Sequence, residues 1–351
     1  MSTSKGPTRT PATVQAYLVR DASLTRAAAA YFETEDFGID QYVNWLIEEK
    51  RPALAASSWR QIRASAREGL LALIRAHPEL DAVVRIEIER LDEARPAPLP
   101  AMIPPRTSAL KSKKLPDLDR LCARVASSRS PNARHLVWFL KASAIAGLRP
   151  SEWQTAKLQP ADASDVSTGV YTWRLVVRNC KTTNGRSTGE TRTLYWTSLT
   201  ATEVRAIRET IAEASRQKSL GTFLTWLSTL SRLLYVQSRA LFPRRRSGHP
   251  TLSSGRHEAA ARWKAHYIER ANTPEERERG RAIVAALMGH ISDETASRHY
   301  GRVAGGSGRM PIAHAAESEV LLVRKIMAAR LEKLASLHGA SRRHELTHSH
   351  C

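Results

Sequence analysis

The sequence has no long apolar run, no leader-like beginning and few cysteines, and each absence excludes a class of protein. No uncharged apolar stretch reaches the length of about 18 residues that a membrane-spanning helix needs, so we expect none. Residues 1–13 are polar, so we expect no secretion signal. Cys122, Cys180 and Cys351 are too far apart in sequence for a disulfide framework or a zinc site, which favours a reducing cytoplasm. The sequence contains no P-loop or metal-ligand motif.

Acidic residues are scarce relative to basic ones. The chain has 34 Asp and Glu against 54 Lys and Arg, which gives a net charge of +20 and an isoelectric point near 10.5. An excess of this size can serve solubility alone, but it is more typical of a protein that binds a polyanion, and nucleic acid is the first candidate. The 351 residues, 42% of them apolar, are enough for two domains with cores of their own.

Composition divides the chain into a helical part and a mixed part. Closely spaced prolines and added lysines make residues 95–114 the best linker. We expect a disordered tail over 1–12, a helical domain over 13–94, a second domain over 115–338 and a flexible tail over 339–351. In the helical domain one predicted helix face carries Trp59, Ile62, Ala66, Leu70 and Leu73.

The second domain mixes helical patterns with one β-hairpin pattern. Residues 170–198 have β-branched and aromatic residues on both sides of a turn-rich centre, which predicts an antiparallel hairpin. A basic, glycine-containing loop is expected over 242–256. Helices are predicted at 116–128, 132–147, 201–217, 222–240, 257–271, 277–289, 293–300 and 317–338. The fold class is therefore mainly α with a small antiparallel β-sheet.

Four segments carry residues suited to chemistry on a phosphodiester. They are "GLRPSEW" with Arg149, "RNCKTTNGR" with Lys181, "SSGRHEAAARW" with Arg256, and "LMGHISDETASRHYGR" with His290 and Tyr300. Taken singly, each has an ordinary explanation, such as a surface ion pair or a solvated turn. Together they offer two guanidinium forks for a phosphate, a phenol that can attack phosphorus, a lysine that can protonate a leaving oxygen, and an imidazole.

This ordered set resembles the tyrosine recombinase (phage integrase) family over residues 115–302, and the first and last segments are its most specific part. The resemblance implies a helical SAM-like core-binding domain followed by an α+β catalytic domain. It implies that Arg149, Lys181, Arg256 and His290 are catalytic and that Tyr300 is the nucleophile that forms a 3′-phosphotyrosyl bond with DNA. It also implies a structural role for Glu152, which follows Arg149 by three residues.

The chain departs from the family pattern around Arg256. The family has a histidine where this chain has Ser253. Ser253 and His257, which is next to Arg256, are possible accessory residues. An alternative register uses His257 and Arg262, although the small residues after Arg256 favour the first register. The interval from residue 256 to residue 290 is also longer than in the family, with a polar insertion between them.

The resemblance also implies that no metal or nucleotide cofactor is required, because the phosphotyrosyl bond stores the energy of the phosphodiester, and the lack of P-loop and metal-ligand motifs agrees with this. It implies partners for the protein as well. It implies double-stranded DNA as substrate, with no small-molecule substrate, and a homotetramer on paired sites, in which the amphipathic helix at 317–338 either packs on its own domain or docks on a neighbour. Arg244, Arg245 and Arg246 are candidate contacts to DNA phosphates. The expected activity is that of a mobile-element integrase in the bacterial cytoplasm, associated with the nucleoid. A non-catalytic DNA-binding protein and a type IB topoisomerase are the alternatives.

Overall fold

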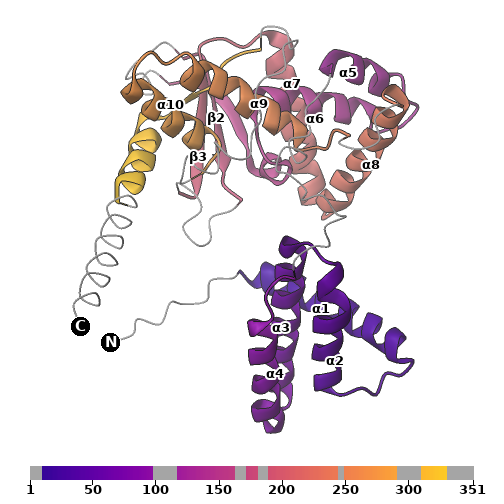
Figure 1. The fold of residues 1–351 in the computed structure, drawn as a ribbon. Coiled ribbons are helices and arrows are strands. Elements are labelled where there is room, and N and C mark those ends of the chain that lie inside the picture. Colours follow the sequence, from indigo (N-terminus) through magenta and orange to yellow (C-terminus); the bar gives the residue numbers. More distant parts are fainter. Residues whose placement is uncertain are drawn as a thin grey trace, which may run out of the picture. The chain divides into compact units, whose positions relative to one another are not determined.

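The chain forms two compact units, residues 1–106 and residues 107–351, in a computed structural model (Figure 1). The structure describes residues 10–97, 117–162, 171–180, 189–243, 249–290 and 310–329. Most of the described residues are helical, and one small antiparallel sheet lies in the second unit. The predicted fold class, mainly α with a small antiparallel sheet, is confirmed. No helix among these residues is long and apolar enough to span a bilayer.

The first unit is a helical bundle around buried aromatic residues. Its main helices are α1 (Pro11–Phe32), α2 (Ile39–Trp45), α3 (Ala56–Ala76) and α4 (Asp81–Glu93), with short turns η1 (Leu46–Lys50), η2 (Arg51–Ala53) and η3 (Pro78–Leu80) between them. Trp59 of α3 is fully buried, and its indole N–H donates to the carbonyl of Ala94 at 2.8 Å. This bond joins α3 to the end of α4. α1 begins at Pro11 because proline tolerates the first helical turn, so residues 11–12 are helical rather than part of the expected tail.

The second unit packs helices around a larger apolar core. They are α5 (Leu118–Ala126), α6 (Ala133–Ala146), α7 (Ala201–Ser219), α8 (Phe223–Leu241), α9 (Ser254–Lys264) and α10 (Pro274–Leu287), with short helical turns η5 (Pro150–Thr155) and η8 (Ala265–Glu269). α6 is buried along most of its length and contacts α5, α7 and α9. Thr200 and Thr273 cap α7 and α10 through their side chains. In each case the side chain of the glutamate three residues later accepts a hydrogen bond from the backbone N–H of the threonine.

Four strands form one antiparallel sheet in the order β1 (Lys157–Pro160), β2 (Trp173–Arg178), β3 (Thr191–Trp196) and β4 (His314–Ala315). β2 and β3 are the predicted hairpin, and they pair with Leu175 opposite Leu194. β1 and β4 were not predicted, because strands of four and two residues are too short for an alternation pattern. β3 packs against α10, and this contact brings the sheet to the residues described below.

The segment that follows β4 is helical over residues 317–329 and packs on its own domain. Val320 and Val323 are buried against Ala282 and Ala286 of α10. Arg279 of α10 donates two hydrogen bonds of 2.7 Å to Glu317, one to each carboxylate oxygen. The described part of this helix therefore packs on its own domain, which is one of the two arrangements expected from the sequence.

Candidate functional site

Arg149 lies where the buried helix α6 ends. Gly147 adopts a left-handed conformation with φ of 63°, which stops the helix, and a side chain there would collide with Trp263. Pro150 then begins the turn η5, so Arg149 is held in an extended conformation between two helical segments. Its side chain is mostly buried, with 16% exposed. Arg149 therefore has a fixed backbone and a guanidinium at the margin of the core.

Glu152 receives hydrogen bonds from two arginines. Arg149 donates its backbone N–H at 2.8 Å and its Nη1 at 2.7 Å to the two carboxylate oxygens. Arg192 donates Nη2 at 2.6 Å and Nη1 at 3.2 Å to the same two oxygens. Arg256 approaches to 3.8 Å through Nη1. The Glu152 carboxylate is fully buried, so these charged partners are what makes its burial possible.

Arg192 is a site residue that the sequence analysis missed. It lies in β3 and is fully buried, on the inward face that also carries Leu194 and Trp196. Besides Glu152 it bonds the carbonyl of Leu287 through Nε at 3.0 Å and the side-chain oxygen of Asn179 through Nη1. The sequence did contain a signal for its burial. Side chains alternate between the two faces of a strand, so Arg192 shares a face with two apolar residues.

Arg256 is buried in the first turn of α9 and not in the loop that was predicted to extend to residue 256. The helix starts three residues early because the Ser254 hydroxyl accepts the Thr251 N–H at 2.9 Å and closes the preceding turn. Arg256 donates to the carbonyl of Gly147 at 2.7 Å and to that of Met288 at 2.6 Å. It therefore joins the end of α6 to the end of α10.

His290 follows α10 and is buried beside Arg256. Its Nε2 lies 3.4 Å from Nη2 of Arg256. Because an arginine can only donate, Nε2 is the acceptor nitrogen in this contact, and the proton of the neutral ring is on Nδ1. Arg149, Arg256 and His290, chosen from three separate motifs, thus meet around Glu152 and Arg192.

Burial and charge fix the protonation states of this cluster. Burial opposes ionisation of Glu152, but the three guanidinium groups outweigh it and hold the pKa of this carboxyl well below its usual range. Burial first, and then the positive charges of the same arginines, lower the pKa of His290 to about 2. At neutral pH the five side chains comprise three cations, one anion and one neutral ring, which leaves a net charge of +2.

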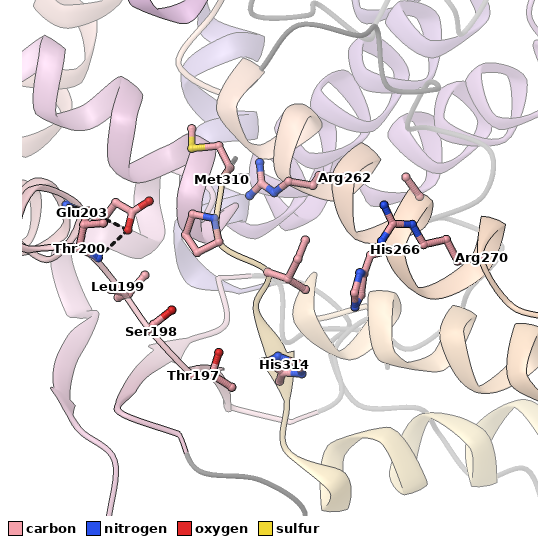
Figure 2. A pocket seen from close by; sticks show the side chains of 13 residues that line it. Thr197, Ser198, Leu199, Thr200, Glu203, Arg262, His266, Arg270, Met310 and His314 are labelled. Atoms are coloured by element: carbon pink, nitrogen blue, oxygen red, sulfur yellow. Dashed lines mark hydrogen bonds between the residues drawn. The ribbon is translucent and has the colours of Figure 1, made fainter. Parts of the chain in front are cut away.

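Arg262, the alternative second arginine, lies in a different environment. Its Nη2 donates to the carbonyls of Ala144 at 2.8 Å and Ile145 at 3.4 Å, and burial lowers its pKa to about 10. It lines a pocket of about 860 Å³ between α9, the start of α7 and the segment before β4 (Figure 2). His266 and Arg270 line the same pocket. Ser253 precedes α9 at its N-cap, and His257 is half-buried in the first turn of that helix.

Several predicted residues lie outside the described residues. They are Lys181, Tyr300, and the three arginines Arg244, Arg245 and Arg246. Asn179, two residues before Lys181 in sequence, is described and bonds Arg192. The described chain also contains no group of three or more histidine, cysteine, aspartate or glutamate side chains arranged to hold a metal ion.

The solved structures that are similar to this chain include one of a DNA-bound integrase. A crystal structure of a lambda integrase(75-356) dimer bound to a COC′ core site has 15% sequence identity and a TM-score of 0.40, over 88% of this chain and 94% of that one. No protein-family model matches the sequence, and no curated protein matches it.

Proposed function

We propose that this chain is a site-specific DNA recombinase of the tyrosine type, which cleaves and rejoins DNA strands through a 3′-phosphotyrosyl intermediate. The observation that carries the proposal is the convergence of Arg149 and Arg256 on Glu152, with the neutral His290 beside them. A cluster of buried side chains with a net positive charge is complementary to a phosphodiester, whose own charge is −1. It is more complementary still to the pentavalent transition state, in which negative charge accumulates.

Each residue has a role in this proposal. Arg149 and Arg256 hold the non-bridging oxygens of the scissile phosphate through their guanidinium forks. Tyr300 attacks the phosphorus, so that a phosphotyrosyl bond forms as the bond to the 5′-oxygen breaks. Lys181 gives that oxygen its proton, which leaves a free 5′-hydroxyl.

His290 and Glu152 have supporting roles. His290 is neutral at physiological pH, so its ring can donate to a phosphate oxygen or accept the phenolic proton of Tyr300. Glu152 orients both arginines and does not itself approach the anion, because a carboxylate would repel it. Strand exchange follows when the 5′-hydroxyl of a second strand attacks the phosphotyrosyl bond.

The proposed partner is double-stranded DNA, and the net charge of +20 supports it. Arg244, Arg245 and Arg246 are proposed to contact phosphates. The proposal extends to a homotetramer on paired sites, to an origin in a mobile element, and to the bacterial cytoplasm. The helix at 317–329 packs on its own domain, so any exchange between neighbours would involve residues beyond it.

A suicide-substrate assay tests the proposed chemistry. Duplex fragments that tile the flanks of the gene, each with a nick just beyond the candidate cleavage position, lose the short 5′-hydroxyl strand after attack and trap the adduct. We expect a covalent protein–DNA complex that survives heat and detergent and that is absent from Tyr300→Phe. DNA binding without an adduct would indicate a non-catalytic binding protein, and relaxation of plasmids of any sequence would indicate a type IB topoisomerase.

A further inference from the structure

Arg192 joins three segments of the second unit while remaining fully buried itself. Its guanidinium reaches Glu152 on η5, Asn179 at the end of β2 and the carbonyl of Leu287 at the end of α10. These partners are 40, 13 and 95 residues away in sequence. A side chain with no exposed surface does not reach a DNA phosphate, so any part that Arg192 has in the reaction acts through its partners.

Arg149, Arg256 and His290 form the proposed anion site, and two of the partners of Arg192, Glu152 and Leu287, stand next to these residues. Glu152 fixes Arg149 through two hydrogen bonds. Leu287 precedes Met288, whose carbonyl holds Arg256, and His290 follows two residues later. Gly289 between them has φ of 60°, and a Cβ there would collide with Nη1 of Arg192 and with Asn179. The close fit of this glycine against Arg192 determines the path of the chain from α10 into His290.

Arg192 also contributes to the protonation states of Glu152 and His290. Of the groups that favour the ionised form of Glu152, Arg192 is the strongest, ahead of Arg256 and Arg149. Its positive charge also contributes to keeping His290 neutral. Without Arg192, the buried carboxyl would lose two charge-assisted hydrogen bonds and would hold a proton at higher pH. A protonated Glu152 has only one acceptor oxygen of full strength and does not hold both Arg149 bonds as firmly.

From these contacts we propose that Arg192 is a positioning residue of the anion site, which holds Glu152 ionised and orients Arg149, Arg256 and His290 without touching DNA. This inference rests on the proposed function, since it concerns the same site. If Arg192 has this role, its replacement changes how the reaction rate depends on pH, which a purely structural residue would not do.

The test compares Arg192→Met and Arg192→Gln, which are neutral, with Arg192→Lys, which keeps the charge. Arg174→Met is the matched control, because Arg174 lies on the neighbouring strand and pairs with the half-exposed Asp162. The readout is the rate of adduct formation on nicked DNA between about pH 5 and about pH 9. The melting temperature of every variant is measured at each pH, and rates are compared only where the protein is folded.

We expect the neutral variants to form the adduct roughly 10- to 100-fold more slowly near pH 6. Losses of this size are typical when a hydrogen-bond partner that orients a metal-binding side chain is removed. Part of the rate should return as the pH is raised, because Glu152 then ionises. Arg192→Lys should keep the pH profile of the wild type at a reduced rate, and Arg174→Met should match the wild type. The same profile for all three Arg192 variants and the wild type would overturn the proposal.

A second readout separates this inference from the proposed function. The carboxyl carbon of Glu152, labelled with ¹³C and assigned by comparison with Glu152→Gln, is followed by NMR over the same pH range. We expect no titration in the wild type and a titration in Arg192→Gln. If the wild type forms no adduct, the proposed function fails, but the NMR titration still decides the role of Arg192. An unchanged carboxyl signal in Arg192→Gln would refute that role.

Discussion

Glu152 and Arg192 form a fully buried ion pair, with hydrogen bonds of 2.6 and 3.2 Å between the two nitrogens Nη2 and Nη1 and the two carboxylate oxygens. One partner belongs to a short turn after α6 and the other to the middle of the sheet. The pair fixes the distance between these two elements, and Arg149 and Arg256 are arranged around it. Its removal should therefore affect both stability and the anion site.

Replacing Glu152 by glutamine should destabilise the second unit by about 3–5 kcal/mol, because it leaves buried guanidinium groups without their counter-charge. Urea unfolding, followed by the fluorescence of the buried tryptophans, measures this. The control is Asp162→Asn at the half-exposed pair with Arg174, which should change the free energy of unfolding by less than about 1 kcal/mol. Equal effects of the two substitutions would show that the buried pair contributes little.

Docking of the helix at 317–329 should weaken as the pH rises through about 7. Burial raises the pKa of Glu319 to about 7, while the bond from the Thr193 N–H opposes this. Because the folded pKa lies above the ordinary value of 4.5, the docked state binds the proton more tightly. Its contribution is complete below about pH 4.5 and is lost as the pH passes about 7. Hydrogen exchange of this helix at several pH values measures the effect.

Two single variants, Glu317→Gln and Glu319→Gln, provide the controls for that prediction. Glu319→Gln should remove the loss of protection at high pH. The hydrogen bond from Arg279 lowers the pKa of Glu317, so the contribution of Glu317 to docking has the opposite pH dependence. It is complete above the ordinary pKa of 4.5 and is lost as the pH falls through the lowered pKa of the docked state. Glu317→Gln should thus weaken docking at neutral pH and leave the transition near pH 7 in place. A transition that survives Glu319→Gln would assign it to another group.

Arg256→Ala should lower the rate of adduct formation by at least about 100-fold, and Arg262→Ala should leave it near the wild-type rate. The two substitutions are matched, because each removes a guanidinium from α9 and leaves two backbone carbonyls without that donor. Of these two arginines, it is Arg256 that lies against Glu152 and His290. Melting temperatures identify any loss that comes from unfolding. The reverse order of rates would transfer the role to Arg262 and its pocket.

Replacing Arg244, Arg245 and Arg246 together by alanine should reduce the slope of log K for DNA binding against log salt by up to about 3, since each phosphate contact contributes about 0.9. The loss should be similar for specific and random DNA, because phosphate contacts carry no sequence information. Fluorescence anisotropy at several salt concentrations gives the slopes. Arg216→Ala, which removes an exposed guanidinium that pairs with Glu213, is the control. An unchanged slope would exclude these arginines from the DNA interface.

The local patterns of the sequence predicted the hairpin and most of the helices that the structure describes, and the catalytic roles of Arg149, Arg256 and His290 stay predictions. The run before Arg149 predicts a buried helix, and α6 is that helix. The turn-rich centre between two β-branched segments predicts the pairing of β2 with β3. These predictions succeed because capping, periodicity and turn residues act over a few positions along the chain. Arg149, Arg256 and His290 were found because each lies in a short motif of its own.

Only the tertiary structure decided which charges meet. The alternation of the strand could have placed Arg192 on the buried face, but nothing local identifies its partners Glu152 and Leu287, which are 40 and 95 residues away in sequence. The strands β1 and β4 lie at the two edges of the hairpin, where β1 contacts α7 and β4 contacts α10. A buried ion pair depends on the distance between its partners in space and on the water that packing excludes, and neither quantity is a local property of the sequence.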